Sequence, residues 1–232
     1  MKTLLPLYRI AMHSTTWFET LPKDVRKHVH DCARHRHVQI GHRLFTRGDT
    51  AVGVFCVLKG CVQLSGVSSD GDQTVLDFYG PGAWFGEVAL LDGSLHIYDA
   101  VVVSPSTVLQ FAPDVFEELL EKYPPFSRGL LRLEALRIRL LLAAIEAYGS
   151  QTLEQRLANR LLMLSGSFGV KEKNGTALEL HLPQETLAQL IGATRQRVNQ
   201  ILKEWESGGK ITHQYGRIVM YDRKWYERLA QM

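Results

Sequence analysis

Residues 182–203 read LPQETLAQLIGATRQRVNQILK, and this stretch decides the fold of the second half of the chain. Its apolar residues recur at helical spacing on both sides of Gly192, which predicts two short helices joined by a tight turn. The residues expected to face inward are Leu187, Ala188, Ile191, Val198, Ile201 and Leu202. Such a pair is a helix-turn-helix, whose common use is to place its second helix in the major groove of DNA.

The second of these helices also has a polar, basic face. Arg side chains suit guanine, Gln and Asn suit adenine, and basic residues also meet phosphates. The candidate DNA-contacting residues are Thr194, Arg195, Gln196, Arg197, Asn199, Gln200 and Lys203. Arg197 lies off the line of the base readers and is expected to meet a phosphate. The predicted partner is therefore double-stranded DNA.

Charge and composition agree with this prediction. The 232 residues carry a net charge of +3, and from residue 151 onward there are 12 Lys and Arg against 8 Asp and Glu. The positive excess thus lies in the half with the helix-turn-helix, as a phosphate-binding face requires. No apolar run is long enough to cross a bilayer and the N-terminus lacks a signal-peptide core, so no membrane association and a cytoplasmic location are expected.

The first half of the chain changes from a helical to a two-residue period after His35. A short helix is predicted to start near Pro22. Short strands are predicted at residues 38–40, 43–45, 52–58, 61–65, 73–78, 97–103 and 107–111. Glycine- and proline-rich turns separate them, at 48–49, 59–60, 70–72, 80–82 and 104–105, and Asp70-Gly71 is the best hairpin signal. This pattern predicts a sandwich or small barrel.

A short helix opening at Pro113 and a long helix over residues 126–148 are predicted next. Apolar residues at heptad spacing on the long helix suggest a seam that faces a second copy of the chain, although a core helix of a monomer fits the same residues. The expected interface residues are Phe126, Leu133, Leu136, Leu140 and Ala143. A hinge at Gly149, a helix over residues 152–164, a linker at 171–175 and a hairpin formed by residues 208–220 complete a winged helix.

Several motifs occur in an order typical of one family. They are Phe45-x-x-Gly48-Asp49, Val57-Leu58-x-Gly60-x-Val62-x-Leu64, Gly80-x-Gly82-x-x-Phe85-Gly86-Glu87-x-Ala89-Leu90-Leu91 and Leu187-Ala188-x-x-Ile191-Gly192-x-Thr194-Arg195. Together they resemble the cyclic-AMP receptor protein/fumarate-nitrate regulator family of bacterial transcription regulators, from about Trp17 to Tyr226. The resemblance implies an α+β protein: an N-terminal double-stranded β-helix (a β-roll of the cyclic-nucleotide-binding kind), a long dimerisation helix and a C-terminal winged helix-turn-helix.

The same resemblance implies an effector site at Gly86, Glu87 and His96. In the family the Glu holds a ribose hydroxyl, and an Arg about ten residues later neutralises a cyclic phosphate. Here His96 stands at the Arg position and Ile97 at the neighbouring hydroxyl position, so cyclic-AMP binding is not expected. A pocket for another molecule and a turn that only shapes the roll remain as alternatives.

No cofactor is predicted. An iron–sulfur cluster is not expected with Cys32 as the one cysteine near the N-terminus, and a metal ion or haem held by the histidines between His28 and His42 has little support. On a helix, His28, Cys32 and His35 would share a face, but a solvated, histidine-rich helix surface is the favoured explanation. No nucleophile–base pair or phosphate loop indicates an enzyme.

The sequence therefore predicts a homodimeric, sequence-specific DNA-binding transcription regulator. Its expected parts are a sensor roll at residues 1–125, a dimerisation helix at 126–149 and a DNA-binding domain at 150–232. A near-palindromic operator, RNA polymerase and a small-molecule effector are the expected partners. The alternative is a small-molecule-binding module with a vestigial DNA-binding domain.

Overall fold

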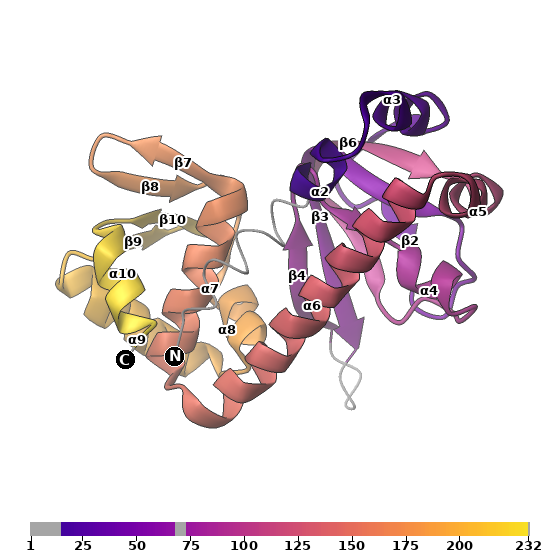
Figure 1. Cartoon of the computed structure of the whole chain (residues 1–232). Helices are drawn as coiled ribbons and strands as arrows, with labels where there is room; N and C mark the ends of the chain where they lie inside the picture. Colours follow the sequence, from indigo (N-terminus) through magenta and orange to yellow (C-terminus); the bar gives the residue numbers. More distant parts are fainter. Residues whose placement is uncertain (1–14, 68–72, 232) are drawn as a thin grey trace. The chain divides into compact units, whose positions relative to one another are not determined.

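The structure is a computed structural model that describes residues 15–67 and 73–231. The chain divides into two compact units, one extending to Ile138 and the other running from Arg139. The first unit is a β-roll with flanking helices, and the second is a helical domain with a small sheet (Figure 1). This is the predicted α+β architecture. The hairpin predicted at Asp70-Gly71 lies outside the described residues.

The roll is built from one antiparallel sheet of six strands that differ in length. Its strands are β1 (Arg34–Val38), β2 (Arg43–Phe45), β3 (Val54–Val67), β4 (Gln73–Tyr79), β5 (Trp84–Phe85) and β6 (Asp99–Phe111). The order is β1-β6-β3-β4, with β2 paired to β6 and β5 paired to β3. The helices of this unit are α2 (Thr15–Glu19), α3 (Lys23–Asp31), α4 (Glu87–Leu91), α5 (Pro113–Lys122) and the start of α6 (Pro124–Ser150).

Two predicted turns are wrong, because β3 and β6 run through them. At Lys59-Gly60 the ladder with β6 shifts register, so the glycine marks a β-bulge and not a chain reversal. Gly60 has φ +91, and a Cβ there would lie 2.2 Å from Oγ of Ser106 on β6. Only glycine allows this close approach of the two strands. The turn predicted at residues 104–105 lies inside β6, opposite the same bulge.

The first strand also lies earlier than predicted. The segment at 38–40 was expected from its apolar residues, whereas β1 starts at Arg34 and pairs along β6 from Gln110 to Ser106. The residues of β1 before Val38 are mostly exposed, and Val38 is buried. An edge strand of alternating Arg and His carries no apolar signal, so its backbone pairing decides its position.

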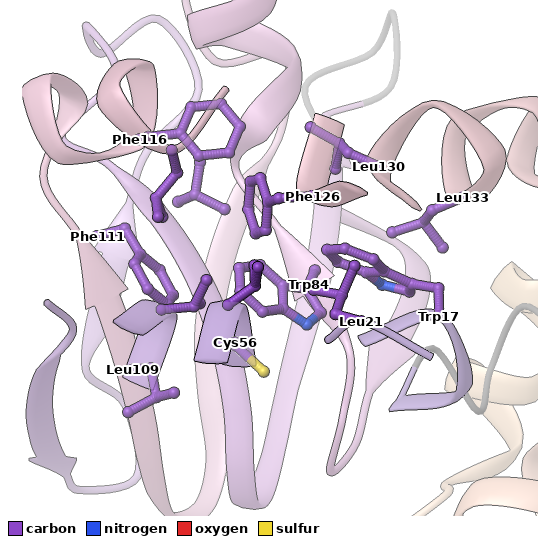
Figure 2. Close-up of a cluster of buried hydrophobic side chains, with 14 residues drawn as sticks. Trp17, Leu21, Cys56, Trp84, Leu109, Phe111, Phe116, Phe126, Leu130 and Leu133 are labelled. Atoms are coloured by element: carbon purple, nitrogen blue, oxygen red, sulfur yellow. The ribbon is translucent and has the colours of Figure 1, made fainter. Parts of the chain in front are cut away.

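An aromatic core joins the helices of the first unit to the roll. Figure 2 shows Trp17, Trp84, Phe111 and Phe126 among the labelled side chains of this cluster. The ring centroids of Trp17 and Trp84 lie 5.3 Å apart, and that of Phe126 lies 5.5 Å from Trp17. A second cluster fills the inside of the roll, with Phe45, Phe55 and Phe85 among its members. Burial of the rings in the first cluster, which includes Phe126, stabilises the start of α6 on the roll.

The second unit contains the helix-turn-helix and a four-stranded sheet. Its helices are the end of α6, α7 (Leu153–Phe168), α8 (Gln184–Ile191), α9 (Arg195–Ser207) and α10 (Arg223–Leu229). Its strands are β7 (Gly169–Glu172), β8 (Gly175–Leu178), β9 (Ile211–Gln214) and β10 (Arg217–Met220), in the order β7-β8-β10-β9. The expected linker at 171–175 is thus the hairpin β7–β8, which its polar residues concealed. Among the described helices, none is long and apolar enough to cross a membrane.

Candidate nucleic-acid interface and ligand site

The helix-turn-helix has the geometry that the sequence predicts. Gly192 ends α8 in the left-handed conformation with φ +62, and Ala193 donates its N–H to the carbonyl of Ala188. Thr194 is the N-cap of α9, and its Oγ1 accepts a hydrogen bond from the N–H of Arg197 at 3.3 Å. The residues expected to face inward are all buried: Leu187, Ala188, Ile191, Val198, Ile201 and Leu202. Their burial leaves the opposite face of α9 to solvent.

Most of the predicted DNA-contacting residues lie on that exposed face. Arg195, Gln196, Arg197, Gln200 and Lys203 are exposed, and Thr194 lies beside them at the start of the helix. The first two lie at the N-terminal end of α9, where a recognition helix offers side chains to base edges.

Asn199 differs from its neighbours. It is half-buried, and its Oδ1 accepts a hydrogen bond from Nε2 of Gln184 at 3.1 Å. Because reading adenine takes both the oxygen and the nitrogen of an amide, this bond reduces the ability of Asn199 to act as a base reader. The contact fixes α8 against α9, and the sequence could not reveal it because the two residues come from different helices.

Gln200 is also held by its neighbours. Its Oε1 accepts from Nη1 of Arg197 at 2.7 Å, and its Nε2 donates to Oε1 of Glu204 at 3.1 Å. Arg197 lies 3.9 Å from the carboxylate of Glu154 as well. The carboxylates of Glu154 and Glu204 reduce the positive potential at this side of α9, whereas Arg195 and Gln196 have no acidic partner in the part of the chain that the structure describes.

The wing is the hairpin β9–β10. Tyr215 lies at its tip with φ +51, a conformation that is unusual for any residue except glycine, and its side chain is 99% exposed. Arg217 at the start of β10 pairs with Glu172 of β7, and Nζ of Lys210 lies 3.4 Å from Asp222. The wing therefore presents an aromatic ring to solvent beside a basic residue.

The roll places Gly86 and Glu87 together, at the start of α4. Gly86 has φ +91, and a Cβ there would lie 3.0 Å from the carbonyl oxygen of Gly53 and 3.3 Å from the ring of Phe55. The glycine is therefore required by both its backbone conformation and its close packing. Its conformation aims Glu87 into the unit, where that side chain is 1% exposed.

Glu87 binds a cation supplied by the same chain. Nη1 of Arg137 on α6 donates to Oε1 of Glu87 at 2.6 Å and to Oε1 of Glu134 at 2.7 Å, and Nη2 donates to the carbonyl of Trp84. Burial raises the pKa of Glu134 to about 7, although the charge of Arg137 opposes the shift. Arg137 also lies 6.0 Å from the centre of the Tyr79 ring.

Arg137 was not predicted as a site residue, although the apolar periodicity of α6 carried a signal. Phe126, Leu130 and Leu133 are buried on one face of α6, and Arg137 continues the same face four residues later. An arginine on a buried helix face needs a carboxylate partner. That partner, Glu87, lies 50 residues earlier in the chain, so only the fold identifies it.

His96 is the third predicted residue of the ligand site, and it is buried. Its ring stacks on that of Phe45 with centroids 3.7 Å apart and planes 7° apart, and its Nε2 has no hydrogen-bond partner among the described residues. Burial lowers the pKa of His96, an effect that the charge of Asp49 partly opposes. A neutral ring packed flat on an aromatic does not replace the guanidinium that binds a cyclic phosphate.

The cavity at this place is small. It is lined by Gly86, Val88, Ala89, Leu95, His96, Ile97 and Tyr98. Its volume is about 10 Å³. Because pockets for small molecules measure ~300–1,000 Å³, this cavity has no room for a nucleotide in the conformation described.

The histidine-rich segment does not gather its side chains into one cluster. His35 belongs to β1, so it does not share a helix face with His28 and Cys32 as the spacing suggested. The thiol of Cys32 donates to the carbonyl of His28 at 2.7 Å, and the rings of His30 and His35 lie 5.0 Å apart. No group of three or more metal-binding side chains occurs in the part of the chain that the structure describes.

Two of the expected dimer-interface residues are core residues instead. Phe126 and Leu133 are buried in the aromatic core of the first unit, so assigning them to a surface between two copies was wrong. Leu136, Leu140 and Ala143 are half-buried. The exposed large apolar residues of α6 are Leu131, Ile138, Leu141, Leu142, Ile145 and Tyr148.

A β-roll of the cyclic-nucleotide-binding kind, followed by a long helix and a winged helix-turn-helix, defines a DNA-binding transcription regulator with an effector domain. Comparison with known proteins agrees: residues 35–123 match the cyclic nucleotide-binding domain, and residues 155–229 match the Crp-like helix-turn-helix domain. The chain belongs to the CRP/FNR family, whose members are transcription regulators and not enzymes.

Individual relatives support this membership. The global nitrogen regulator of Synechocystis is 31% identical over 77% of this chain and 80% of its own length. The CRP-like cAMP-activated global transcriptional regulator of Mycobacterium tuberculosis is 27% identical over 82% of this chain and 84% of its own. Among solved structures, a CRP/FNR-family regulator from Thermus thermophilus is 26% identical with a TM-score of 0.65, over 86% of this chain and 99% of its own. FixK2 from Bradyrhizobium japonicum has a TM-score of 0.74 at 20% identity, over 85% of this chain and 96% of its own, and shows the shared fold.

Proposed function

We propose that the protein is a cytoplasmic homodimer that reads a near-palindromic operator through Arg195 and Gln196. The observation that carries this proposal is the exposure of both side chains at the N-terminal end of α9, beyond the cap formed by Thr194. Arg195 suits the acceptors of guanine, and Gln196 suits the paired acceptor and donor of adenine.

Other residues extend the contact to the DNA backbone. Arg197, Lys203 and Arg217 are exposed cations on α9 and the wing, and they suit phosphates. Gln200 has a supporting role, because Arg197 holds the oxygen of its amide and Glu204 holds the nitrogen. Asn199 has a supporting role, because Gln184 holds its oxygen.

Dimerisation is assigned to α6. Its exposed apolar residues, with Leu136, Leu140 and Ala143 beside them, provide a stripe that a second copy would cover. In functional terms, residues 1–125 form the sensor, 126–149 the dimerisation helix and 150–232 the reader. Two-fold symmetry would place the two readers in successive major grooves, about one helical turn apart, within reach of RNA polymerase.

The experiment is a binding titration on DNA selected from a random library. Arg195→Ala should weaken binding by ~1–3 kcal/mol and relax the preference at one base position, and Gln196→Ala should relax it at the neighbouring position. Lys224→Ala serves as the matched control, since Lys224 is an exposed cation on α10 of the same domain. The logarithm of the binding constant should fall linearly with the logarithm of the salt concentration, because phosphate contacts release counterions.

If Arg195→Ala and Gln196→Ala bind with the affinity and base preference of Lys224→Ala, the assignment of the base readers is wrong. Binding that does not respond to salt, or no binding by the wild type, would favour a ligand-binding module with a vestigial DNA-binding domain.

A further inference from the structure

One guanidinium links two carboxylates inside the first unit. Arg137 donates to Glu87, to Glu134 and to the backbone of Trp84, so its side chain connects α6 to the strand and helix that form the ligand site. The Arg137 side chain is 23% exposed, whereas Glu87 is 1% exposed. This is the part of the roll where a family member with a bound nucleotide would offer its Glu to a ribose hydroxyl.

The charge of Arg137 is what allows Glu87 to be buried. An ionised carboxylate without a partner is costly in an apolar interior, and an arginine supplies a partner that stays charged at every pH a protein meets. Oε1 of Glu87 is bound by Arg137, while Oε2 has no hydrogen-bond partner among the described residues. Within residues 15–67 and 73–231, Arg137 is the charged partner on which Glu87 depends.

The remainder of the site is filled by side chains of the roll. His96 stacks on Phe45 where the family has its phosphate-binding Arg, and the adjoining cavity holds only about 10 Å³. Leu95 and Ile97 at its mouth are exposed apolar residues, which offer nothing to a charged phosphate. Both halves of a nucleotide site, for the sugar and for the phosphate, are thus taken by the chain itself.

We propose that Arg137 is a built-in ligand of the roll. It takes the carboxylate that would otherwise hold a nucleotide, and it joins α4 to α6 in the absence of any effector. The protein then binds its operator without a cyclic nucleotide, and Arg137 is the positioning residue that maintains this state through Glu87. The inference rests on the proposed DNA-binding function, because both measurements below use the operator; the nucleotide titration by calorimetry, within the first of them, does not.

The first measurement uses the wild-type full chain alone. Cyclic AMP and cyclic GMP are titrated into the protein by calorimetry, and the operator is titrated with and without each nucleotide. We expect no heat of nucleotide binding and an operator affinity that changes by less than about twofold. Nucleotide binding, or operator binding that requires a nucleotide, overturns the inference while leaving the DNA-binding function intact. Failure to bind any operator would instead overturn the proposed function.

The second measurement is a double-mutant cycle on operator affinity. Arg137→Gln leaves the Glu87 charge unpaired and should weaken operator binding by ~5–150-fold, the usual range of coupling between two sites. Adding Glu87→Gln to that variant removes the unpaired charge, so the double variant should bind no more weakly than Arg137→Gln. Arg132→Gln is the matched control, because Arg132 is an exposed arginine on the same helix.

Losses that add independently in the double variant, or an Arg137→Gln variant that binds like Arg132→Gln, overturn the role of Arg137. Melting temperatures measured on all variants separate this role from a loss of folding. A general fold defect would lower operator binding only in step with the folded fraction. If Arg137→Gln does not fold, Glu87→Gln alone tests the contact, since it removes the same ion pair from the other side, and operator binding equal to that of Arg132→Gln overturns the role of Arg137.

Discussion

Replacing Phe126 by alanine tests whether this residue belongs to the core or to an interface. Phe126 has no exposed surface, and its ring centroid lies 5.5 Å from Trp17, 5.9 Å from Trp84 and 6.2 Å from Phe116. Removing a buried phenyl ring from such packing costs ~3–5 kcal/mol, because the apolar contacts are lost and a cavity remains. With a urea slope of ~2 kcal/mol per M, the unfolding midpoint should fall by about 2 M.

The assay is urea unfolding followed by circular dichroism, with variant and wild type compared at the same protein concentration and at several concentrations, because association stabilises a dimer by mass action. Ile97→Ala is the control. Ile97 belongs to the same unit and is equally apolar, but it is 63% exposed, so its loss should change the stability by less than ~0.5 kcal/mol. A loss below ~1 kcal/mol for Phe126→Ala, or a loss that disappears as the protein concentration rises, would refute the core assignment.

Two further predictions concern Gly192 and the thiols. Gly192→Ala should lower stability by ~1–2 kcal/mol in the same unfolding assay, because alanine is strained in the left-handed conformation and its Cβ would lie 2.8 Å from the ring of Tyr148; an unchanged midpoint would contradict this. A thiol reagent should modify Cys32 first, because Cys32 is half-buried, and should reach the buried Cys56 and Cys61 only after unfolding. Burial also raises the pKa of all three thiols, and that of Cys56 to about 12, which lowers their reactivity in the native protein. Equal rates for the three cysteines in the native protein would show that the roll opens.

The helix-turn-helix could be predicted because its signal is local. The apolar residues of α8 and α9 follow a helical period, and Gly192, whose left-handed backbone conformation ends α8, separates the two helices. The inward-facing residues were therefore assigned correctly from spacing alone. What spacing could not predict is which polar residues of α9 already have partners, such as Asn199 with Gln184.

The roll could be predicted as a class but not in detail. Gly60 indicates a turn when read along the chain, whereas in space it permits two strands to approach at a bulge. The strand β1 is mostly polar and exposed, and β7 is exposed throughout, so neither has the alternation that identifies strands. These elements form because their backbones pair with neighbours that only the fold supplies.

The ligand site was the least predictable part. Gly86 and Glu87 were predicted from family motifs, and they lie at the start of α4. Arg137 was not found, because its role follows from a contact with a residue far away in the sequence. A single arginine on the inner face of a long apolar helix predicts a buried carboxylate partner elsewhere in the chain.

The pairing of β3 with β6 has a consequence for how the protein folds. Val54 lies opposite Phe111 and Ser65 lies opposite Asp99, so the whole ladder joins segments that are distant in the chain. Contacts of this kind form slowly, because the intervening loop must close before any pairing is gained. The helix-turn-helix needs mostly local contacts and should fold faster once it is synthesised. Since the ribosome makes the roll first, the slow unit has more time to fold before the fast one emerges.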